Sequence, residues 1–277
     1  MTVTAPVPEP AIGAGVSPVL AEACRAASAA ARHAWSDLDR DARAEEMRLG
    51  ADGTPTMRID ELVEDAIVAV AEAHRINLLS EEVGFLDHGS ARTLVVDPLD
   101  GSANAAAGVP LSCFSGAIVA DEVPVEALTC WLETGRSISA RSGEPVTYRT
   151  SGRTSLTGSA LSMLRPKVGA WGDTTGVWTD LSGRAGRVRI LSTSCLEAML
   201  VADGSIDAFA DPGSDTHRLV DLIAAQLIVP AAGGHVCDAF GRDIDFSHDL
   251  TMRYSGVVAA SRDLAEEISA VIAAHPA

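Results

Sequence analysis

Short apolar runs alternate with amphipathic helical patterns along the whole chain, and this alternation is the strongest constraint on its fold. In the helical segments the apolar residues recur at the spacing of one buried helix face. Helices are therefore expected over 17–49, 59–70, 195–201, 216–232 and 264–274. The apolar runs bounded by turn residues are expected to be strands, at 76–79, 93–96, 116–119, 125–131, 188–191, 206–210 and 254–259, with further strand-like segments towards Tyr148.

Interleaved strands and helices predict a layered α/β or α+β architecture. The sequence has no internal repeat and no linker long enough to separate independent domains. We therefore expect an N-terminal α+β half over 17–150 and a C-terminal α/β half over 151–277, joined in one compact catalytic unit. Residues 1–16 are rich in Pro, Ala and Gly, and we expect a flexible leader there rather than a signal peptide.

The string TLVVDPLDGSANA is the most informative motif in the chain. Asp97 ends an apolar strand, and Asp100 follows after a Pro-Leu turn, so the two carboxylates can converge on one point. Hard cations such as Mg²⁺ take oxygen ligands of this kind, and the Leu99 carbonyl can supply another. The backbone N–H groups of Gly101 and Ser102 can begin a helix that binds phosphate. The alternative is an ordinary turn, because Asp-Gly and Pro are common turn formers.

Two further acids favour the metal site over the turn. Glu81, in the sequence Ser80-Glu81-Glu82, follows another strand, and Asp221 lies in an apolar helical segment where an unpartnered carboxylate is costly. Each acid also has an ordinary explanation, as a solvated strand end or as a first-turn Asp that complements the helix dipole. Three acidic clusters at strand ends or at a helix start together predict a cation site.

Composition excludes several classes of partner. The chain carries 38 acidic and 21 basic residues, a formal charge of −17, which should repel nucleic acid and anionic membrane surfaces. Its 47% hydrophobic content predicts a folded core, and no apolar run is long enough to span a bilayer. The five cysteines are widely spaced and form no CxxC pair, so a reducing cytoplasm is expected.

The order SEE, VVDPLDGS and RLVD followed by AAGG resembles the inositol monophosphatase superfamily of Mg²⁺-dependent phosphomonoesterases. The segments GADGTPTMRIDELVED and TSCLEAMLVADGSIDAF are similar to the archaeal-type branch, which acts on inositol monophosphate and fructose 1,6-bisphosphate. The resemblance implies an α+β fold, a layered αβαβα sandwich. It also implies roughly two or three Mg²⁺ ions per site, a small phosphorylated metabolite as substrate, and a homodimer.

The resemblance also assigns roles to individual positions. Asp60, Glu81 and Ser102 match catalytic positions, with Asp60 and the Ser102 hydroxyl orienting the nucleophilic water. The implied metal ligands are Glu81, Asp97, the Leu99 carbonyl, Asp100 and Asp221. The implied substrate-binding residues are Asp100, Gly101, Ser102, Thr193, Ser194, Asp211 and Arg218, of which Arg218 is expected to meet the substrate phosphate.

The sequence departs from the family pattern at several positions. Ser80 replaces the usual Gly, Ser102 the usual Thr, and Ala105 an aromatic residue of the inositol-specific branch. Pro230 replaces a Glu before the Gly pair, and a proline there is expected to kink the helix. The segment 145–174 has no clear counterpart. The substrate therefore remains open among inositol, fructose bisphosphate, histidinol and nucleotide or nucleoside phosphates.

The expected reaction is direct in-line attack by a metal-bound water, with clustered Mg²⁺ ions neutralising the ester. The haloacid dehalogenase class is a rival with the same chemistry, but its D-x-D motif differs from the D-P-L-D spacing found here. A second rival is a catalytically inactive homologue that binds metal or phosphate. Zinc or redox chemistry through Cys195, His217 or His235 is a third, and their spacing matches no ligand motif.

Overall fold

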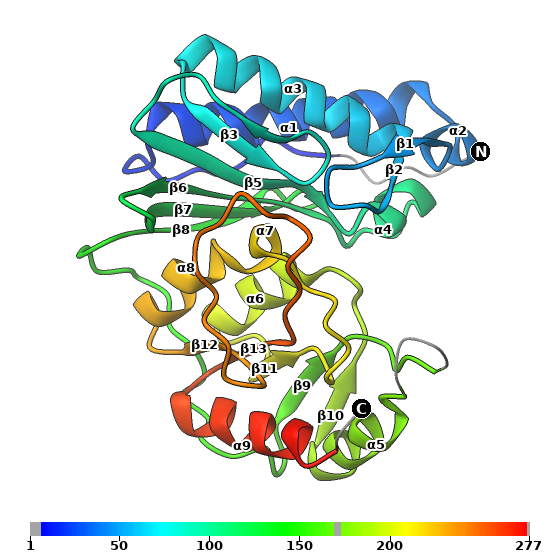
Figure 1. Ribbon diagram of the computed structural model, residues 1–277, viewed down its shortest axis with the longest axis vertical. Helices are drawn as coiled ribbons and strands as arrows, with labels where there is room; N and C mark the ends of the chain where they lie inside the picture. The colour runs from blue at the N-terminus through cyan, green and yellow to red at the C-terminus, as the bar shows by residue number, and fades with distance from the viewer. Residues whose placement is uncertain (1–6, 169–172, 276–277) are drawn as a thin grey trace.

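The computed structural model describes residues 7–168 and 173–275. Its helices and strands form five layers (Figure 1), in which two sheets alternate with three layers of helices. The expected αβαβα sandwich is therefore confirmed. Helices α1 and α3 form the outer layer of the N-terminal half, and α5 and α9 cover the opposite end.

The N-terminal half contains a six-stranded sheet in the order β4-β3-β5-β6-β7-β8. Strands β3 and β5 run parallel, and the other neighbours in this sheet are antiparallel. The elements of this half are α1 (Pro18–Asp37), α2 (Arg40–Arg43), β1 (Glu46–Leu49), β2 (Pro55–Met57), α3 (Arg58–His74), β3 (Asn77–Ser80), β4 (Gly84–Leu86), β5 (Arg92–Asp100), α4 (Ser102–Ala107), β6 (Cys113–Ala120), β7 (Val123–Trp131) and β8 (Arg136–Arg141).

The C-terminal half contains a five-stranded sheet in the order β10-β9-β11-β13-β12. Helices α6, α7 and α8 lie between this sheet and the larger one (Figure 1). The elements of this half are β9 (Ala160–Met163), α5 (Thr175–Arg184), β10 (Arg187–Arg189), α6 (Ser194–Ala202), β11 (Ala208–Ala210), α7 (Leu219–Leu222), α8 (Ala225–Ala231), β12 (His235–Asp238), β13 (Gly256–Ala259) and α9 (Arg262–Ala273).

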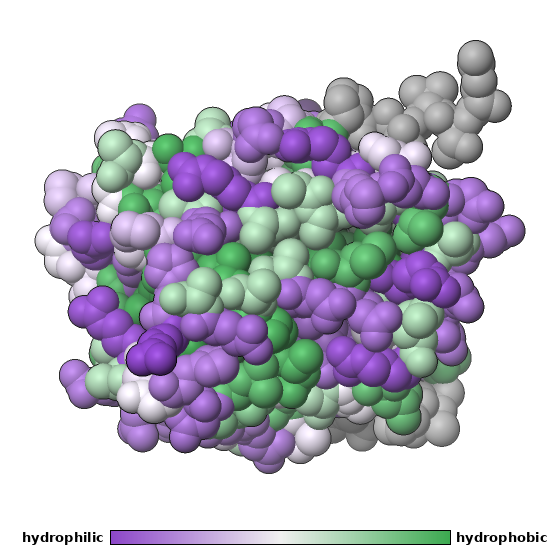
Figure 2. Space-filling model, turned by 90° about the horizontal axis from the view of Figure 1, so that it is seen from above, coloured by the Kyte–Doolittle hydropathy of each residue, from purple (hydrophilic) through white to green (hydrophobic). Residues whose placement is uncertain are grey.

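Buried side chains form three apolar clusters, which fill the spaces between the layers. One joins α1 and α3 to the large sheet, a second surrounds α6, α7 and α8, and a third lies between the small sheet and α5 and α9. On the outer face over α1 and α3, seen from above in Figure 2, polar side chains are interspersed with apolar ones. No helix of the described residues is long and apolar enough to cross a membrane.

Two expected helices are wrong in extent. The first ends at Asp37 instead of continuing through residue 49, because Asp39 caps a separate short helix and 46–49 pairs with β2 as a hairpin. The helix expected over 216–232 starts only at Leu219, because His217 is held in a bridge to Tyr254, and a turn at 223–224 divides it into α7 and α8. Pro230 lies inside α8, so the interruption falls before the proline rather than at it.

The segment 7–16, expected to belong to a flexible leader, packs against the body of the protein. Val7 is buried, and its carbonyl accepts a hydrogen bond of 2.8 Å from Arg32 Nε. The Ala11 N–H donates to the Gly135 carbonyl, so this segment extends the edge of the large sheet beside β8. The rest of the expected leader, residues 1–6, lies outside the described residues.

Candidate active site

A β-bulge in β5 brings the Asp97 and Asp100 carboxylates to the same side of the sheet. Residues three apart in a regular strand point to opposite faces. Here Asp97 pairs with Ser115 while Asp100 pairs with Cys113, so β5 has one more residue than β6 between these pairs. Both carboxylates are buried. The Pro-Leu insertion recognised in the sequence is therefore the physical cause of their convergence.

Glu81 and Asp221 reach the same place from other elements. Glu81 directly follows β3, and because β3 runs parallel to β5, the carboxyl ends of the two strands meet at one edge. Asp221 lies in α7, a short helix that packs against β5 and β6. The electrostatic influence of both Glu81 and Asp221 reaches Asp97. The structure thus brings the four predicted acidic ligands together from two strand ends and one helix of the other half.

Asp100 is held by the first turn of α6. Its Oδ2 accepts hydrogen bonds from Thr193 Oγ1 at 2.6 Å and from the Cys195 N–H at 2.9 Å, and its Oδ1 accepts one from the Ser194 N–H at 3.1 Å. Thr193 and Ser194, expected to line the substrate pocket, are therefore placed as the residues that orient Asp100. These contacts fix the C-terminal half onto the end of β5.

Arg218 contacts three carboxylates at the centre of the site. Its Nη1 forms ion pairs with Asp52 and Glu81, and its Nε lies 3.2 Å from Asp221 Oδ2. The Arg218 backbone N–H also donates to Asp221 Oδ2 at 2.6 Å. The arginine expected to meet a substrate phosphate is thus bound to the acids in this structure.

Carboxyl groups outnumber basic groups in this cluster. Burial raises the pKa of Glu81 to about 8, although the Arg218 guanidinium lowers it. Burial, followed by the charge of Glu81, holds the pKa of Asp97 well above its usual range. Burial opposes ionisation of Asp221 as well, but Arg218 and then His217 bring its pKa below the usual value. The site therefore has carboxylates that one arginine does not neutralise.

Asp60 and Ser102 lie beside the four acids. Asp60 Oδ2 accepts a hydrogen bond from the Met57 N–H at 2.9 Å, while its buried Oδ1 has no partner among the described residues. Burial raises the pKa of Asp60 to about 6, and the nearby Ser102 hydroxyl reduces this rise. Ser102 Oγ also donates to the Leu99 carbonyl at 2.9 Å. The two predicted water-orienting residues are thus neighbours.

Gly101 must be a glycine for the chain to turn between these groups. Its φ is +84°, in the left-handed region that favours glycine. A Cβ at this position would lie 2.7 Å from the Leu111 carbonyl oxygen and 3.2 Å from Thr193 Oγ1. The glycine therefore allows α4 to start directly after Asp100.

Comparison with known proteins agrees with this arrangement. Residues 15–277 match the model of the inositol monophosphatase family. The chain belongs to this family. A fructose-1,6-bisphosphatase/inositol-1-monophosphatase of Methanothermobacter thermautotrophicus is 34% identical over 241 residues, covering 80% of this chain and 85% of the relative. A fructose-1,6-bisphosphatase of Pyrococcus furiosus is 29% identical over 234 residues, covering 82% of this chain and 87% of that protein.

A solved structure shares the fold. It is a hypothetical protein from Pyrococcus horikoshii with similarities to inositol-1 monophosphatase, with a TM-score of 0.75, 24% identity and coverage of 90% of this chain and 94% of that one. Because its relatives are phosphatases of the inositol monophosphatase and fructose-1,6-bisphosphatase kind, this chain is a phosphoric monoester hydrolase of that family. Family membership also decides against the haloacid dehalogenase alternative.

A cationic pocket opens beside the acids of this phosphatase. The cavity has a volume of about 780 Å³. Lys167, the only lysine in the chain, donates from Nζ to Thr216 Oγ1 at 2.6 Å on the wall of this pocket. The lining residues are Thr54, Glu81, Arg165, Lys167, Val168, Gly213, Ser214, Asp215, Thr216, Arg218 and Arg253. Four basic residues therefore face a cavity in a chain that is strongly acidic overall.

Asp211 supports the loop that forms one wall of this pocket. It is fully buried, and its carboxylate accepts hydrogen bonds from Ser214 N–H at 2.6 Å and from Thr216 N–H at 2.8 Å. The structure thus places Asp211 beneath the pocket loop, with both oxygens occupied by that loop. A role in binding a substrate hydroxyl stays a prediction.

Several residues of the site were not found from the sequence. Asp52, a fully buried partner of Arg218, and the buried Glu64 and Glu82 extend the acidic cluster. Burial raises the pKa of both Glu64 and Glu82 to about 7. Ser80, noted as a departure from the family glycine, donates a hydrogen bond of 2.7 Å to Glu64. Asp52 lies in GADGTPTMRIDELVED, a segment that contributed to the family resemblance without giving Asp52 a role.

The histidine considered for zinc or redox chemistry has a structural role. His217 Nδ1 accepts a hydrogen bond from the Gly256 N–H at 3.1 Å, and its Nε2 lies 3.1 Å from Ser194 Oγ. This buried ring joins α6 to β13. These contacts agree with the sequence, in which the spacing of His217 matches no metal-ligand motif.

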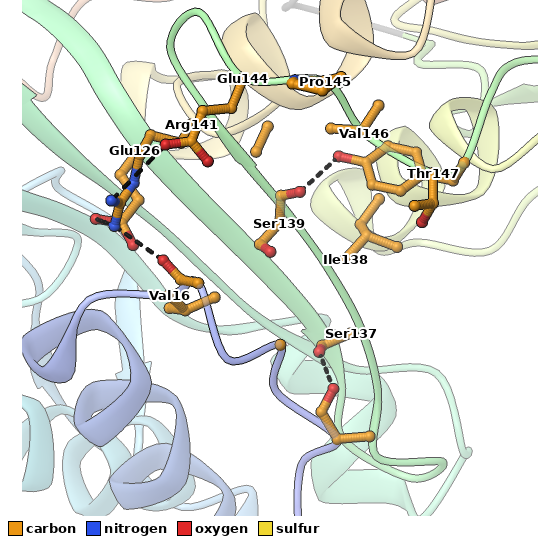
Figure 3. Close-up of a pocket in the computed structure, with 15 residues that line it drawn as sticks. Val16, Glu126, Ser137, Ile138, Ser139, Arg141, Glu144, Pro145, Val146 and Thr147 are labelled. Atoms are coloured by element: carbon orange, nitrogen blue, oxygen red, sulfur yellow. Dashed lines mark hydrogen bonds and ion pairs between the residues drawn. The ribbon is translucent and has the colours of Figure 1, made fainter.

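A second cavity, of about 330 Å³, lies at the β8 edge of the large sheet (Figure 3). Its polar groups pair with one another or with the backbone. Arg141 lies 3.4 Å from Glu126, and Ser137 Oγ donates to the Ala11 carbonyl at 2.6 Å. Its one basic lining residue, Arg141, contacts both Glu126 and Glu144, so acids outnumber bases there and nothing favours binding of a phosphate.

Proposed function

We propose that this phosphatase is Mg²⁺-dependent and hydrolyses a small sugar or cyclitol phosphate to the alcohol and inorganic phosphate. The observation that carries the proposal is the convergence of Glu81, Asp97, Asp100 and Asp221, of which Glu81 and Asp221 contact Arg218. Carboxylate oxygens are the ligands that Mg²⁺ prefers, and a divalent cation would stabilise their ionised form in place of the protons. The predicted roles of these residues as ligands are part of this proposal.

The residues present fit such a cation. One ligand atom each from Asp97, Asp100 and Cys195 lie within 4.8 Å of one another. A cavity of about 10 Å³, lined by Asp60, Glu81 and Asp97 among others, is the size of one small ion or water. The Leu99 carbonyl borders the same cavity. Roughly two or three Mg²⁺ ions remain the proposed number, and when bound they would neutralise the ester and lower the pKa of water.

The chain's own groups would position the nucleophile. Asp60 Oδ1 is buried without a partner, so it is available to accept a proton from a water molecule. The Ser102 hydroxyl keeps the donor and acceptor of the threonine that it replaces. We propose that Asp60 and Ser102 hold the attacking water in line with the ester bond, while Gly101 and Ser102 hold the phosphate. This mechanism needs no covalent intermediate.

The cationic pocket supports a substrate with a second anionic group. Its basic lining residues include Arg165 and Lys167. The other two are already near acids, since Arg218 pairs with three carboxylates and Arg253 lies 3.9 Å from Asp52. Asp215, an acid of the same lining, is paired with Arg242 at 2.6 Å, so it does not neutralise Arg165 and Lys167. Relatives named as fructose-1,6-bisphosphatases make a sugar bisphosphate the first candidate.

Both halves contribute to the proposed centre. Asp97 and Asp100 come from the N-terminal half, and Asp221 comes from the C-terminal half. We therefore propose that the two halves form one catalytic unit. We further propose that the protein is a cytoplasmic homodimer. The five free thiols support the cytoplasmic compartment. The family resemblance supports the dimer.

Release of inorganic phosphate from a panel of sugar and cyclitol phosphates tests the activity, with Mg²⁺ and with EDTA. We expect turnover only with Mg²⁺, and we expect Asp97→Asn to abolish it. Asp87→Asn is the matched control, because this acid lies in the loop between β4 and β5 and bonds only the Gly89 N–H among the described residues. Turnover that survives in Asp97→Asn would contradict the metal site. Absence of turnover on every ester would favour an inactive binding homologue.

Lys167→Ala tests the second anionic group. Loss of one charged contact is worth about 1.5–3 kcal/mol, so KM for fructose 1,6-bisphosphate should rise about tenfold or more. KM for inositol 1-phosphate, which has no second phosphate, should stay within about twofold. An equal rise for both substrates would show that Lys167 does not recognise the second group.

A further inference from the structure

Arg43, the last residue of α2, is the largest of the fully buried side chains in the described part of the chain, with 1% of its surface exposed. Its Nε donates to the Ala106 carbonyl at 3.1 Å, and its Nη1 donates to the Leu38 carbonyl at 2.7 Å. Its Nη2 has no partner among the described residues. Arginine is almost never fully buried without a paired acid, because desolvation of its charge is costly. Its burial against carbonyls therefore needs a specific reason.

The Ala106 carbonyl belongs to the C-terminal end of α4. Trp35, from α1, donates from Nε1 to the neighbouring Ala105 carbonyl at 2.8 Å. The last carbonyls of a helix have no partner within the helix, and the negative ends of their dipoles favour a cation there. Helix α2 also packs on α4 (Figure 1). Arg43 and Trp35 thus anchor α4 at the end that is remote from β5.

Helix α4 has few other means of keeping its direction. It has only six residues, which is too short for a helix to be stable alone. Apart from Asn104, its side chains are one serine and four alanines, which offer little for neighbouring elements to hold. Both of its joints are glycines with a left-handed backbone, at φ +84° for Gly101 and +79° for Gly108, and glycine restricts the backbone least. The orientation of α4 therefore depends on its anchors.

Ser102 is the first residue of α4, so the orientation of this helix sets the position of the Ser102 hydroxyl. Ala106 lies about one helical turn beyond it. We propose that Arg43 is a positioning residue of the phosphatase, which anchors α4 from its C-terminal end and thereby holds the Ser102 hydroxyl beside Asp60. The effect on hydrolysis rests on the proposed function, because Ser102 and Asp60 have their roles there. The anchoring of α4 does not rest on it.

A double-mutant cycle of Arg43→Met with Ser102→Ala tests this role. Methionine keeps a long side chain without a donor or a charge. Phosphate release from fructose 1,6-bisphosphate at saturating Mg²⁺ gives kcat, and circular dichroism gives the folded fraction to which kcat is referred. We expect Arg43→Met alone to lower kcat at least about tenfold, because small misplacements of a reacting group have effects of this size. In the Ser102→Ala background the loss should be less than about twofold, because the hydroxyl that Arg43 positions is already absent.

Two further substitutions at position 43 make the cycle specific. Arg43→Lys keeps the charge, so its loss of kcat should be smaller than that of Arg43→Met. Arg43→Gln keeps an N–H donor without the charge, and it replaces Arg43→Met in the cycle if methionine prevents folding. In every variant KM should change by less than about twofold, because Arg43 does not line the cationic pocket. A general loss of packing would instead lower kcat by the same factor in both backgrounds.

Arg32→Met is the matched control. Arg32, on α1, also donates from Nε to a backbone carbonyl, that of Val7 at 2.8 Å, and in the described residues it has no hydrogen bond or ion pair with α4. This variant should keep kcat within about twofold in both backgrounds. A loss of kcat in Arg32→Met equal to that in Arg43→Met would overturn the proposal.

Hydrogen exchange of the α4 amides tests the anchoring without any substrate. Exchange should become about tenfold faster in Arg43→Met and stay unchanged in Arg32→Met, because only the first substitution removes a contact with α4. If the wild type hydrolyses no ester but α4 shows this change, the proposed function is refuted and the anchoring by Arg43 is supported. Unchanged exchange in Arg43→Met, or an equal loss of kcat in the two backgrounds, would overturn the inference.

Discussion

Replacing Arg218 by Gln tests whether this arginine is the counter-charge of the acidic site in the absence of metal. Its side chain is only 14% exposed, and its partners Asp52 and Asp221 are 0% and 6% exposed, so solvent screens these ion pairs little. Removing one partner of a buried ion pair costs about 3–5 kcal/mol, because the remaining charges have no partner. Three carboxylates lose their cation in this variant. We therefore expect the free energy of unfolding in EDTA to fall by at least about 3 kcal/mol.

Mg²⁺ should reverse most of this loss. A divalent cation bound by Glu81 and Asp221 replaces the missing positive charge, and a ligand that binds only the folded state stabilises it by mass action. At saturating Mg²⁺ we expect the free energies of unfolding of wild type and Arg218→Gln to differ by only about 1 kcal/mol. The variant should also bind Mg²⁺ more tightly, because no guanidinium competes for the carboxylates.

Urea unfolding followed by circular dichroism, in EDTA and in saturating Mg²⁺, measures both differences. Arg253→Gln is the control: this arginine donates to the Asp52 carbonyl at 2.9 Å and lies 3.9 Å from the Asp52 carboxylate, without contact to Glu81 or Asp221 in the described residues. The change in unfolding free energy that Arg253→Gln causes should be small and independent of Mg²⁺. An equal loss for Arg218→Gln in both conditions would refute the idea that Arg218 and metal share the same ligands.

Three further predictions concern the same site. In EDTA the protein should lose stability as pH rises from about 5 to about 8, because folded Glu81, with a pKa of about 8 against an ordinary 4.5, retains a proton that the unfolded chain releases. Thermal unfolding at a series of pH values measures this loss, and stability that is constant or rises with pH would contradict it. The affinity for Mg²⁺, measured by calorimetry, should increase over the same pH interval, since Mg²⁺ binds the deprotonated carboxylate. An affinity that is constant with pH would contradict the idea that Mg²⁺ displaces a proton. Ser102→Ala should lower kcat about 100-fold by removing the hydroxyl beside Asp60, whereas Ser102→Thr should retain kcat within a few fold. Equal kcat values in the two variants would exclude a role for the hydroxyl.

The layered fold was largely predictable because apolar periodicity identifies most elements. The two errors of extent arose where local pattern and tertiary pairing disagree. The segment 46–49 has no apolar strand pattern, and it becomes a strand only because β2 pairs with it. The helix expected over 216–232 starts only at Leu219 because His217 pairs with Tyr254, a residue far along the chain that no local rule connects to it.

For the site, the sequence alone predicted the types of the candidate ligands and their order, because Asp97, Asp100 and Asp221 stand in motifs whose chemistry requires carboxylates. It predicted a Pro-Leu turn between the first two, where the structure has a bulge within β5. Only the tertiary structure decided which cations and thiols meet these acids. Arg218 reaches Asp52 and Glu81 across more than a hundred residues of sequence, and Cys195 reaches Asp97 and Asp100 from the other half of the protein. Such contacts depend on how layers pack, and packing is set by the whole core rather than by any one motif.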